Sequence, residues 1–307
     1  MSGWRMRRGG GTLLLTTKRG GSLMIAFPVI DTHVHLLDQK LFKYSWAKGA
    51  PKLARDWTLD DLASSARPYT IESTVFVEVD VDHPDYMKEA RWVQALADRD
   101  PRMKGCVACL PIEKGAALED EIAELASIPV ARGVRRLIQN QPDPEFVLRA
   151  DVIDATKRLA KYNLSFDLCI FHHQLKNTIA YVKACPDVFF IMDHIAKPGI
   201  KAGLVEPWKT EIRELAALPN VVCKLSGVTT EADHDSWTPE QLKPYVEHVI
   251  DVFGFDRLMY GGDWPVSELA GPYTAWIGLL DQMTSSCSET ERRKLFRDNA
   301  QKFYRLA

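Results

Sequence analysis

Long apolar segments are missing from this sequence of 307 residues. No stretch approaches the roughly 20 consecutive apolar residues that a transmembrane helix requires. An excess of positive charge is missing as well, because the formal net charge at pH 7 is −2. Without residues 1–23, which contain five basic residues and no acidic one, the formal charge falls to −7. A domain with this negative net charge binds nucleic acids and anionic membranes poorly, so we expect neither as a partner.

Cysteines are few, with six in the whole chain. In a chain of this length they do not form the dense pattern of a disulfide framework. Cys106 and Cys109 make a C-x-x-C, but they lie in the apolar run Cys106–Leu110, which is typical of a strand, and no second pair accompanies them. We therefore expect buried free thiols, and a protein of the reducing cytoplasm.

Residues 1–23 lack the features of a targeting segment. Their only apolar run is Leu13–Leu15, which is shorter than the roughly 7–15 residues of a signal-peptide core. The basic, acid-free composition suits a transit peptide, but an amphipathic pattern is absent. We interpret residues 1–23 as a disordered tail, or as a stretch upstream of a natural start at Met24. Residues 24–307 are then one folded domain.

Strand-like and helix-like segments alternate through the rest of the chain. Most of the strand-like runs are separated by roughly 25–40 residues, enough for a crossover helix and two loops. Thr238–Gln241 and Ser288–Glu291 are capping boxes that predict helix starts, and Gly254 suits the end of the first of these helices. The eight apolar, β-branched runs are residues 29–35, 74–79, 105–110, 133–138, 165–170, 188–194, 220–225 and 257–260.

Eight alternating units without a change of composition predict an α/β protein with a single closed (β/α)₈ barrel of the TIM type. The alternative is an open, doubly wound sheet. That fold usually has a glycine-rich phosphate loop after its first strand. This chain has His33-Val34-His35 at that position, so the barrel is favoured.

Polar residues end the first predicted strand, in the order Asp31-Thr32-His33-Val34-His35. In a parallel barrel, catalytic groups come from the carboxyl ends of the strands. Because side chains two apart share a face, we expect Asp31, His33 and His35 to point into the barrel, with His35 nearest the mouth. Two imidazoles there could bind a metal or polarise a carbonyl. The motif alone leaves an incidental, exposed pair as the alternative.

Two more strand ends carry polar groups. Asp193-His194 ends the sixth strand, and Gly261-Gly262-Asp263-Trp264 follows the eighth. On its own, a histidine at a strand end is more often structural, and Gly-Gly-Asp is more often a surface turn. In a barrel, however, both segments would converge on His33 and His35. The two glycines would let the backbone approach a bound group and would aim the carboxylate inward.

Taken together, these segments resemble the amidohydrolase superfamily, in its amidohydrolase 2 group. They look most like the sugar-lactonase subgroup that includes L-fuconolactonase and L-rhamnonolactonase, and more distantly like 2-pyrone-4,6-dicarboxylate lactonase. The resemblance implies a hydrolase that opens a lactone, with His33, His35, His194 and Asp263 as the catalytic residues. The likeness spans Ile30 to Tyr304 and includes Tyr44–Trp46, Gly133–Leu137, Val222–Gly227 and Asp298–Ala300.

The resemblance also bears on the metal. Many metal-dependent relatives have a lysine on the fourth strand or a histidine at the end of the fifth. This chain has Arg135 and Arg136 on the fourth strand and Asp167–Phe171 on the fifth, so we expect no binuclear site. One divalent ion, zinc or manganese, and a metal-free site both stay open. The candidate ligands are His33, His35 and Asp263, with Glu78 as an additional one.

Opening a lactone requires an activated water and a stabilised carbonyl oxygen. Asp263 is the candidate general base, and the three histidines would stabilise the oxyanion from the opposite side. Other side chains near the strand ends could bind the substrate. A salt bridge is the alternative role for each arginine, and core packing for each tryptophan. The candidates are Trp46, Arg135, Arg136, Lys224, Glu231 and Trp264.

Two other functions stay open at this point. A metal-dependent decarboxylase of the same superfamily is disfavoured, because the resemblance asks for a metal-binding histidine on the fifth strand. A barrel that only binds a ligand is disfavoured, because it has no physical need for the four catalytic residues. The expected partner is a small-molecule lactone, and a homo-oligomer is compatible with the sequence.

Overall fold

The computed structural model describes residues 2–9, 12–19 and 24–306. Eight strands form one parallel sheet in the order β10-β9-β8-β7-β6-β5-β4-β3. Each of the eight predicted runs overlaps one of them. The strands are β3 (Val29–Val34), β4 (Ile71–Val77), β5 (Met103–Cys109), β6 (Ala131–Leu137), β7 (Ser165–Cys169), β8 (Phe190–Met192), β9 (Val221–Leu225) and β10 (Leu258–Tyr260).

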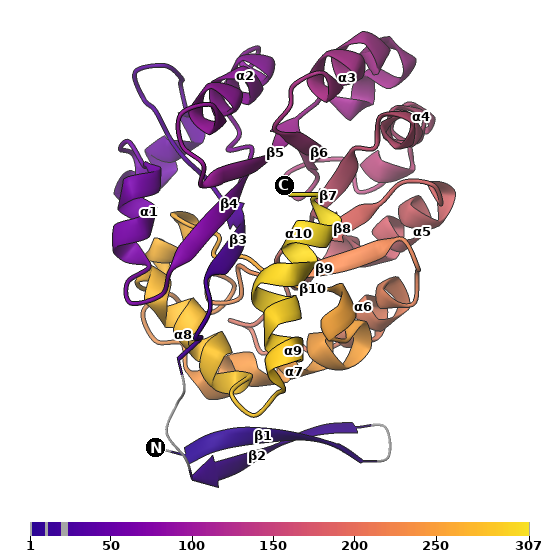
Figure 1. Ribbon diagram of the computed structural model, residues 1–307. Coiled ribbons are helices and arrows are strands. Elements are labelled where there is room, and N and C mark those ends of the chain that lie inside the picture. Colours follow the sequence, from indigo (N-terminus) through magenta and orange to yellow (C-terminus); the bar gives the residue numbers. More distant parts are fainter. Residues whose placement is uncertain (1, 10–11, 20–23, 307) are drawn as a thin grey trace.

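The sheet closes between its first and last strands. Val34 forms a parallel bridge with Trp264, and the N–H of His35 donates to the carbonyl of Trp264 over 2.7 Å. The Thr32 hydroxyl donates to the carbonyl of Tyr260 over 2.6 Å. In Figure 1 the strands form a ring with the helices outside it. The predicted single (β/α)₈ barrel is confirmed.

Ten α-helices are described, and two begin at the predicted capping boxes. The Gln241 side chain accepts from the N–H of Thr238, and the Ser288 hydroxyl accepts from the N–H of Glu291. Gly254 ends α7 with a φ of 65°. The helices are α1 (Leu59–Ser65), α2 (Tyr86–Ala97), α3 (Glu119–Ala126), α4 (Ala150–Arg158), α5 (Leu175–Ala184), α6 (Trp208–Ala216), α7 (Pro239–Phe253), α8 (Tyr273–Met283), α9 (Glu289–Arg293) and α10 (Asn299–Phe303).

A short antiparallel pair precedes the barrel. Strands β1 (Ser2–Gly9) and β2 (Thr12–Arg19) pair with each other and not with the eight-stranded sheet. Figure 1 shows the pair beneath the barrel, and β1 lies near α8 and β2 near α7. The interpretation of residues 1–23 as a separate, disordered tail stays a prediction.

Buried side chains form two groups. The larger group packs the helices onto the outer face of the sheet. The smaller group fills the inside of the barrel, where strand residues such as Ile30, Val77 and Ile191 meet Ala300 and Tyr304 from the end of the chain. This second group closes one end of the barrel and leaves the carboxyl ends of the strands for a site.

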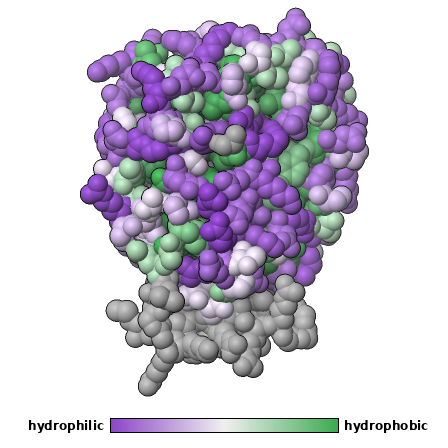
Figure 2. Space-filling model, in the orientation of Figure 1, coloured by the Kyte–Doolittle hydropathy of each residue, from purple (hydrophilic) through white to green (hydrophobic). Residues whose placement is uncertain are grey.

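The cysteines are free thiols, as predicted from the sequence. The described cysteines are free, and all but Cys287 are buried. Hydrophilic residues cover most of the face in Figure 2, with hydrophobic ones in scattered areas. Among the described helices, none combines the length and the hydropathy of a membrane span.

Candidate active site

The carboxyl ends of the strands open into a cavity of about 390 Å³. Its lining comes from loops far apart in the chain, which the barrel brings together. That volume is in the range of small-molecule sites. Six of the residues selected from the sequence line it, namely His35, Trp46, Arg135, His194, Glu231 and Asp263.

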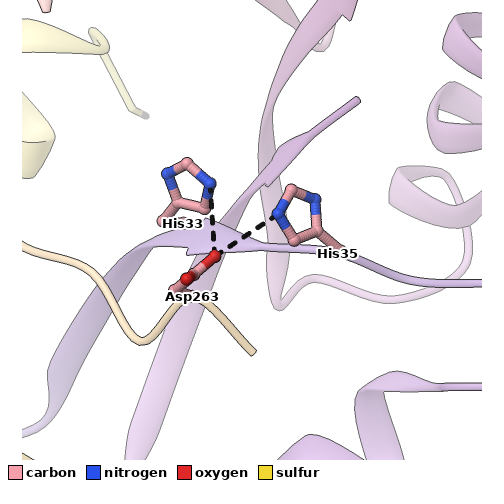
Figure 3. Close-up of side chains that lie close together, drawn as sticks. All are labelled: His33, His35 and Asp263. Atoms are coloured by element: carbon pink, nitrogen blue, oxygen red, sulfur yellow. Dashed lines mark ion pairs between the residues drawn. The ribbon is translucent and has the colours of Figure 1, made fainter. Parts of the chain in front are cut away.

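One carboxylate oxygen lies among the three histidines. Oδ1 of Asp263 is 3.7 Å from Nε2 of His33, 3.6 Å from Nε2 of His35 and 3.8 Å from Nε2 of His194. Figure 3 shows both strand histidines turned toward this carboxylate. All four side chains are buried. The structure thus brings the four predicted catalytic residues together, and their roles stay predictions.

A register shift between β3 and β4 determines where the side chains of His33 and His35 point. The pairing of β3 with β4 slips between Asp31 and Val34, so simple alternation does not hold across His33. The expectation that Asp31 also points into the barrel is wrong. Its carboxylate instead accepts hydrogen bonds from the N–H of Gly262 (2.7 Å) and from the hydroxyl of Tyr273 (2.8 Å) on α8.

Glycine is required beside Asp263, but for a different neighbour than the sequence suggested. A Cβ at Gly262 would clash with the side chains of Asp31 and Tyr273, and a Cβ at Gly261 would come within 2.9 Å of the His33 Cβ. The two glycines therefore let this loop approach the protein's own strand β3, and not a bound group. It holds the loop carrying Asp263 against β3.

Partners on the barrel wall orient the other two histidines. Nδ1 of His35 lies 2.8 Å from the carbonyl oxygen of Val77. Because a carbonyl only accepts, Nδ1 carries a hydrogen and donates it, and Nε2 is the nitrogen directed at Asp263. Nδ1 of His194 lies 3.0 Å from the Ser226 hydroxyl. A Cβ at Gly227, whose φ is 60°, would clash with the His194 ring, so glycine is required there.

Burial and neighbouring charges set the protonation states. Burial lowers the pKa of His33 well below its usual value, and the Lys224 ammonium lowers that pKa further. Burial likewise lowers the pKa of His194, so both rings are neutral near pH 7. Burial raises the pKa of Asp263, but His194 and His35 outweigh it, and the net pKa lies below the ordinary value. Asp263 is therefore ionised near pH 7.

Of the six candidate substrate-binding residues, three do not line the cavity. Arg136 lies on the opposite face of β6 from Arg135 and pairs with Glu113 (2.8 Å). Trp264 is fully buried. Lys224 is fully buried too, and it forms ion pairs with other buried side chains. Direct contact with a substrate is therefore not supported for these three.

Comparison with known proteins identifies the family. A family model described as Amidohydrolase matches residues 30–306. The chain belongs to the amidohydrolase family. It is 32% identical over 284 residues to L-fucono-1,5-lactonase from Burkholderia ambifaria, covering 90% of this chain and 95% of that one. It is 23% identical to L-rhamnono-gamma-lactonase from Scheffersomyces stipitis, covering 92% and 100%.

A solved amidohydrolase structure has the same fold. The enzyme comes from Burkholderia multivorans and was crystallised with bound zinc. It matches with a TM-score of 0.83 and 28% identity over 92% of this chain and 100% of that one. The resemblance to amidohydrolases is therefore confirmed, and the match extends through nearly the whole barrel.

The buried charges of this amidohydrolase fit one divalent cation. Nitrogen and oxygen atoms of His33, His35 and Asp263 lie within 4.8 Å of one another, and such mixed donors suit zinc. Around His33 and its partners, buried negative charge exceeds buried positive charge by two, which a divalent ion would balance. The carboxylates are Glu78, Asp167, Asp193 and Asp263, and the cations are Arg135 and Lys224.

A second group of possible ligands shares a residue with the first. His33, Asp193 and His194 also bring ligand atoms within 4.8 Å of one another. Since His33 belongs to both groups, the two are alternatives for one ion. Glu78, the additional candidate, is engaged by Arg135 over 2.6 Å.

Loop residues that the sequence analysis did not select also line the cavity. They come from turns without periodic patterning, so only the folded barrel identifies them. A carboxylate, two amides, an ammonium and an imidazole are among them. They are Asp80, Gln139, Asn140, Lys197 and His234.

Proposed function

We propose that this amidohydrolase hydrolyses a small sugar-derived lactone. The observation that carries the proposal is the Asp263 carboxylate, which lies within 4 Å of three imidazoles at a cavity large enough for a sugar ring. The printed names of its relatives, L-fucono-1,5-lactonase and L-rhamnono-gamma-lactonase, support the same class of reaction.

Asp263 acts as the general base. It accepts a proton from a water molecule while the water oxygen attacks the lactone carbonyl carbon. The bond between the carbonyl carbon and the ring oxygen then breaks. The proton held by Asp263 passes to the leaving ring oxygen, and the product is an open-chain hydroxy acid. The lowered pKa of Asp263 keeps it ionised, and therefore ready to accept a proton, at neutral pH.

The histidines divide into two kinds. With its Nδ1 donating to the Val77 carbonyl, His35 directs Nε2 to the same point as the Asp263 carboxylate, which suits a bound cation. With the Ser226 hydroxyl donating to its Nδ1, His194 carries its hydrogen on Nε2 and can donate to the developing oxyanion. A divalent ion held by His33, His35 and Asp263 would polarise the lactone carbonyl.

The cavity favours a neutral substrate with several hydroxyl groups. Trp46 supplies a flat apolar wall, while Gln139, Asn140 and Glu231 supply hydrogen-bonding groups. Arg135 is engaged by Glu78 over 2.6 Å, so it is not free to clamp a carboxylate. We therefore infer that aldonolactones are better substrates than dicarboxylate lactones.

A pH-indicator assay tests this proposal directly. Five- and six-membered aldonolactones should release acid, with a higher kcat/KM than a pyrone dicarboxylate. A higher kcat/KM for the pyrone than for every sugar lactone would reverse the assigned substrate class. Carbon dioxide release from a carboxylated substrate, with no acid from any lactone, would overturn the proposed reaction.

A further inference from the structure

A fully buried lysine lies at the centre of a network inside the barrel. Nζ of Lys224 is 2.6 Å from Oδ2 of Asp167 and 3.0 Å from Oδ1 of Asp193. Burying an ammonium group is unfavourable unless carboxylates pair with it. Lys224 does not line the cavity, so the proposed chemistry makes no direct use of it.

The network reaches a catalytic ring at its Nδ1 edge. Nδ1 of His33 lies 3.3 Å from Oδ1 of Asp193 and 3.4 Å from Nζ of Lys224, while Nε2 lies 3.3 Å from Nη1 of Arg135. These three buried side chains surround the ring and fix its orientation. Lys224 and Asp193 thus help to set where Nε2 of His33 lies relative to Asp263, whose Oδ1 is 3.7 Å away.

At its other end the network reaches the last residues of the chain. The hydroxyl of Tyr304, directly after α10, donates to Oδ2 of Asp167 over 2.6 Å. The Tyr304 ring also lies 5.3 Å from Nζ of Lys224, within range of a cation–π contact. Tyr304 is fully buried among the side chains inside the barrel. In Figure 1, α10 crosses the end of the barrel that the chain terminus closes.

We infer that Lys224 and Tyr304 are positioning residues for His33. Tyr304 and Asp167 hold the lysine, and the lysine and Asp193 together hold the Nδ1 edge of the His33 ring. None of the three outer members touches the substrate. The end of the chain, on the far side of the barrel from the cavity, therefore contributes to the arrangement of the catalytic ring.

Replacing Tyr304 with phenylalanine tests this inference with little disturbance of packing. Tyr304→Phe removes only the hydrogen bond to Asp167. Tyr181→Phe is the matched control, because the Tyr181 hydroxyl is also buried and also makes a hydrogen bond, to Thr156, but on the helical layer. Both variants should lose similar thermal stability. Only Tyr304→Phe should lower kcat, by about 3- to 30-fold, because residues that share a hydrogen-bond network are energetically coupled. KM should change little.

A second measurement does not need a substrate. Nuclear magnetic resonance of ¹⁵N-labelled histidine reports which ring nitrogen carries hydrogen, and loss of a signal in His33→Gln assigns the ring. Tyr304→Phe and Asp167→Asn should change the His33 signals, and Tyr181→Phe should leave them unchanged.

A double-mutant comparison checks the route through Lys224. In a Lys224→Met background, adding Tyr304→Phe should change kcat by less than about twofold, because Tyr304 and Asp167 act on His33 through the lysine. The inference would be overturned if the double variant lost kcat by the product of the two single factors. Unchanged His33 signals in Tyr304→Phe would overturn it as well. The kinetic measurements rest on the proposed lactone hydrolysis. If no lactone is a substrate, that function fails, while the resonance measurement still decides the positioning role.

Discussion

Oδ1 of Asp31 accepts a hydrogen bond from the backbone N–H of Gly262 over 2.7 Å, which ties the first barrel strand to the loop that carries Asp263. Its other oxygen accepts from the hydroxyl of Tyr273 over 2.8 Å. A side chain at position 262 would clash with the side chains of Asp31 and Tyr273. Asp31 is therefore an anchor for the catalytic loop, although it does not face the cavity.

Asp31→Asn should alter the pH dependence of stability. Burial raises the pKa of Asp31 from 3.8 to about 6, outweighing the hydrogen bonds it accepts. Since this folded pKa lies above the unfolded one, its contribution to stability is complete below about pH 4 and is lost as the pH rises through 6. The loss is at most on the order of 3 kcal/mol. The asparagine variant does not titrate, so its stability relative to wild type should improve between pH 4 and pH 7.

Urea unfolding at several pH values measures this difference. The wild type and Asp31→Asn are compared at pH 4, 5, 6 and 7, with the slope on urea checked for constancy. A stability difference that stays the same over this range would show that Asp31 does not titrate there.

Asp263→Asn should remove most activity while leaving the fold intact. The substitution keeps the shape of the side chain and removes the basic oxygen. We expect kcat to fall by about 10² to 10⁴-fold, the usual contribution of a general base. Because the pKa of Asp263 is lowered, wild-type activity should decline only as the pH falls below the ordinary range of an aspartate.

Thermal melting of the same samples separates catalysis from structure. Asp256→Asn, which removes a carboxylate paired with Lys294 at the surface, is the control and should leave kcat unchanged. If Asp263 only supported its turn, the variant would lose about 1 kcal/mol of stability and remain active. That result would remove the assignment of the base.

The purified enzyme should bind at most one divalent ion per chain. The two possible ligand groups share His33, and Asp193 in the second group is already paired with Lys224 over 3.0 Å. Elemental analysis should therefore find no more than one equivalent of zinc or manganese, and His35→Gln should lower it. Two equivalents in the active protein would contradict this prediction. Full activity of metal-depleted protein after chelation would support the metal-free alternative.

A protein that begins at Met24 should match the full chain in melting temperature and kcat. Strands β1 and β2 pair only with each other, whereas Ile25 is buried and its N–H donates to Oδ2 of Asp281 over 3.3 Å. Although β1 lies near α8 and β2 near α7, neither strand extends the eight-stranded sheet, and the buried core begins at Ile25. A marked loss of stability or activity on truncation would show that the barrel needs residues 1–23.

Much of the barrel could be predicted because its signals are local. Apolar runs at crossover spacing gave the strands, and the capping boxes at Thr238 and Ser288 gave two helix starts. Asp263 and His194 were found because they follow strands, and the carboxyl ends of parallel strands meet at one face. The fold then brings together residues that the sequence keeps far apart.

The errors arose where a side chain's direction depends on register. Asp31 was expected inside the barrel, but the shift between β3 and β4 breaks the alternation on which that prediction relied. Alternation implied that Arg135 and Arg136 face opposite sides, without saying which one faces inward. Lys224 does lie inside, yet below the cavity floor. Depth along a barrel depends on the stagger of neighbouring strands, which no local pattern encodes.

The closure of the barrel has a consequence for how the enzyme acquires activity during folding. The bond from His35 to Trp264 joins neighbours of two catalytic residues at the seam where the first and last strands meet. The nearby bond between Thr32 and Tyr260 spans 228 residues of sequence. Contacts so distant carry a large loop-closure entropy. A chain with every other strand paired but this seam open would be helical and compact, yet inactive. Regained activity in refolding therefore reports the closing of the ring.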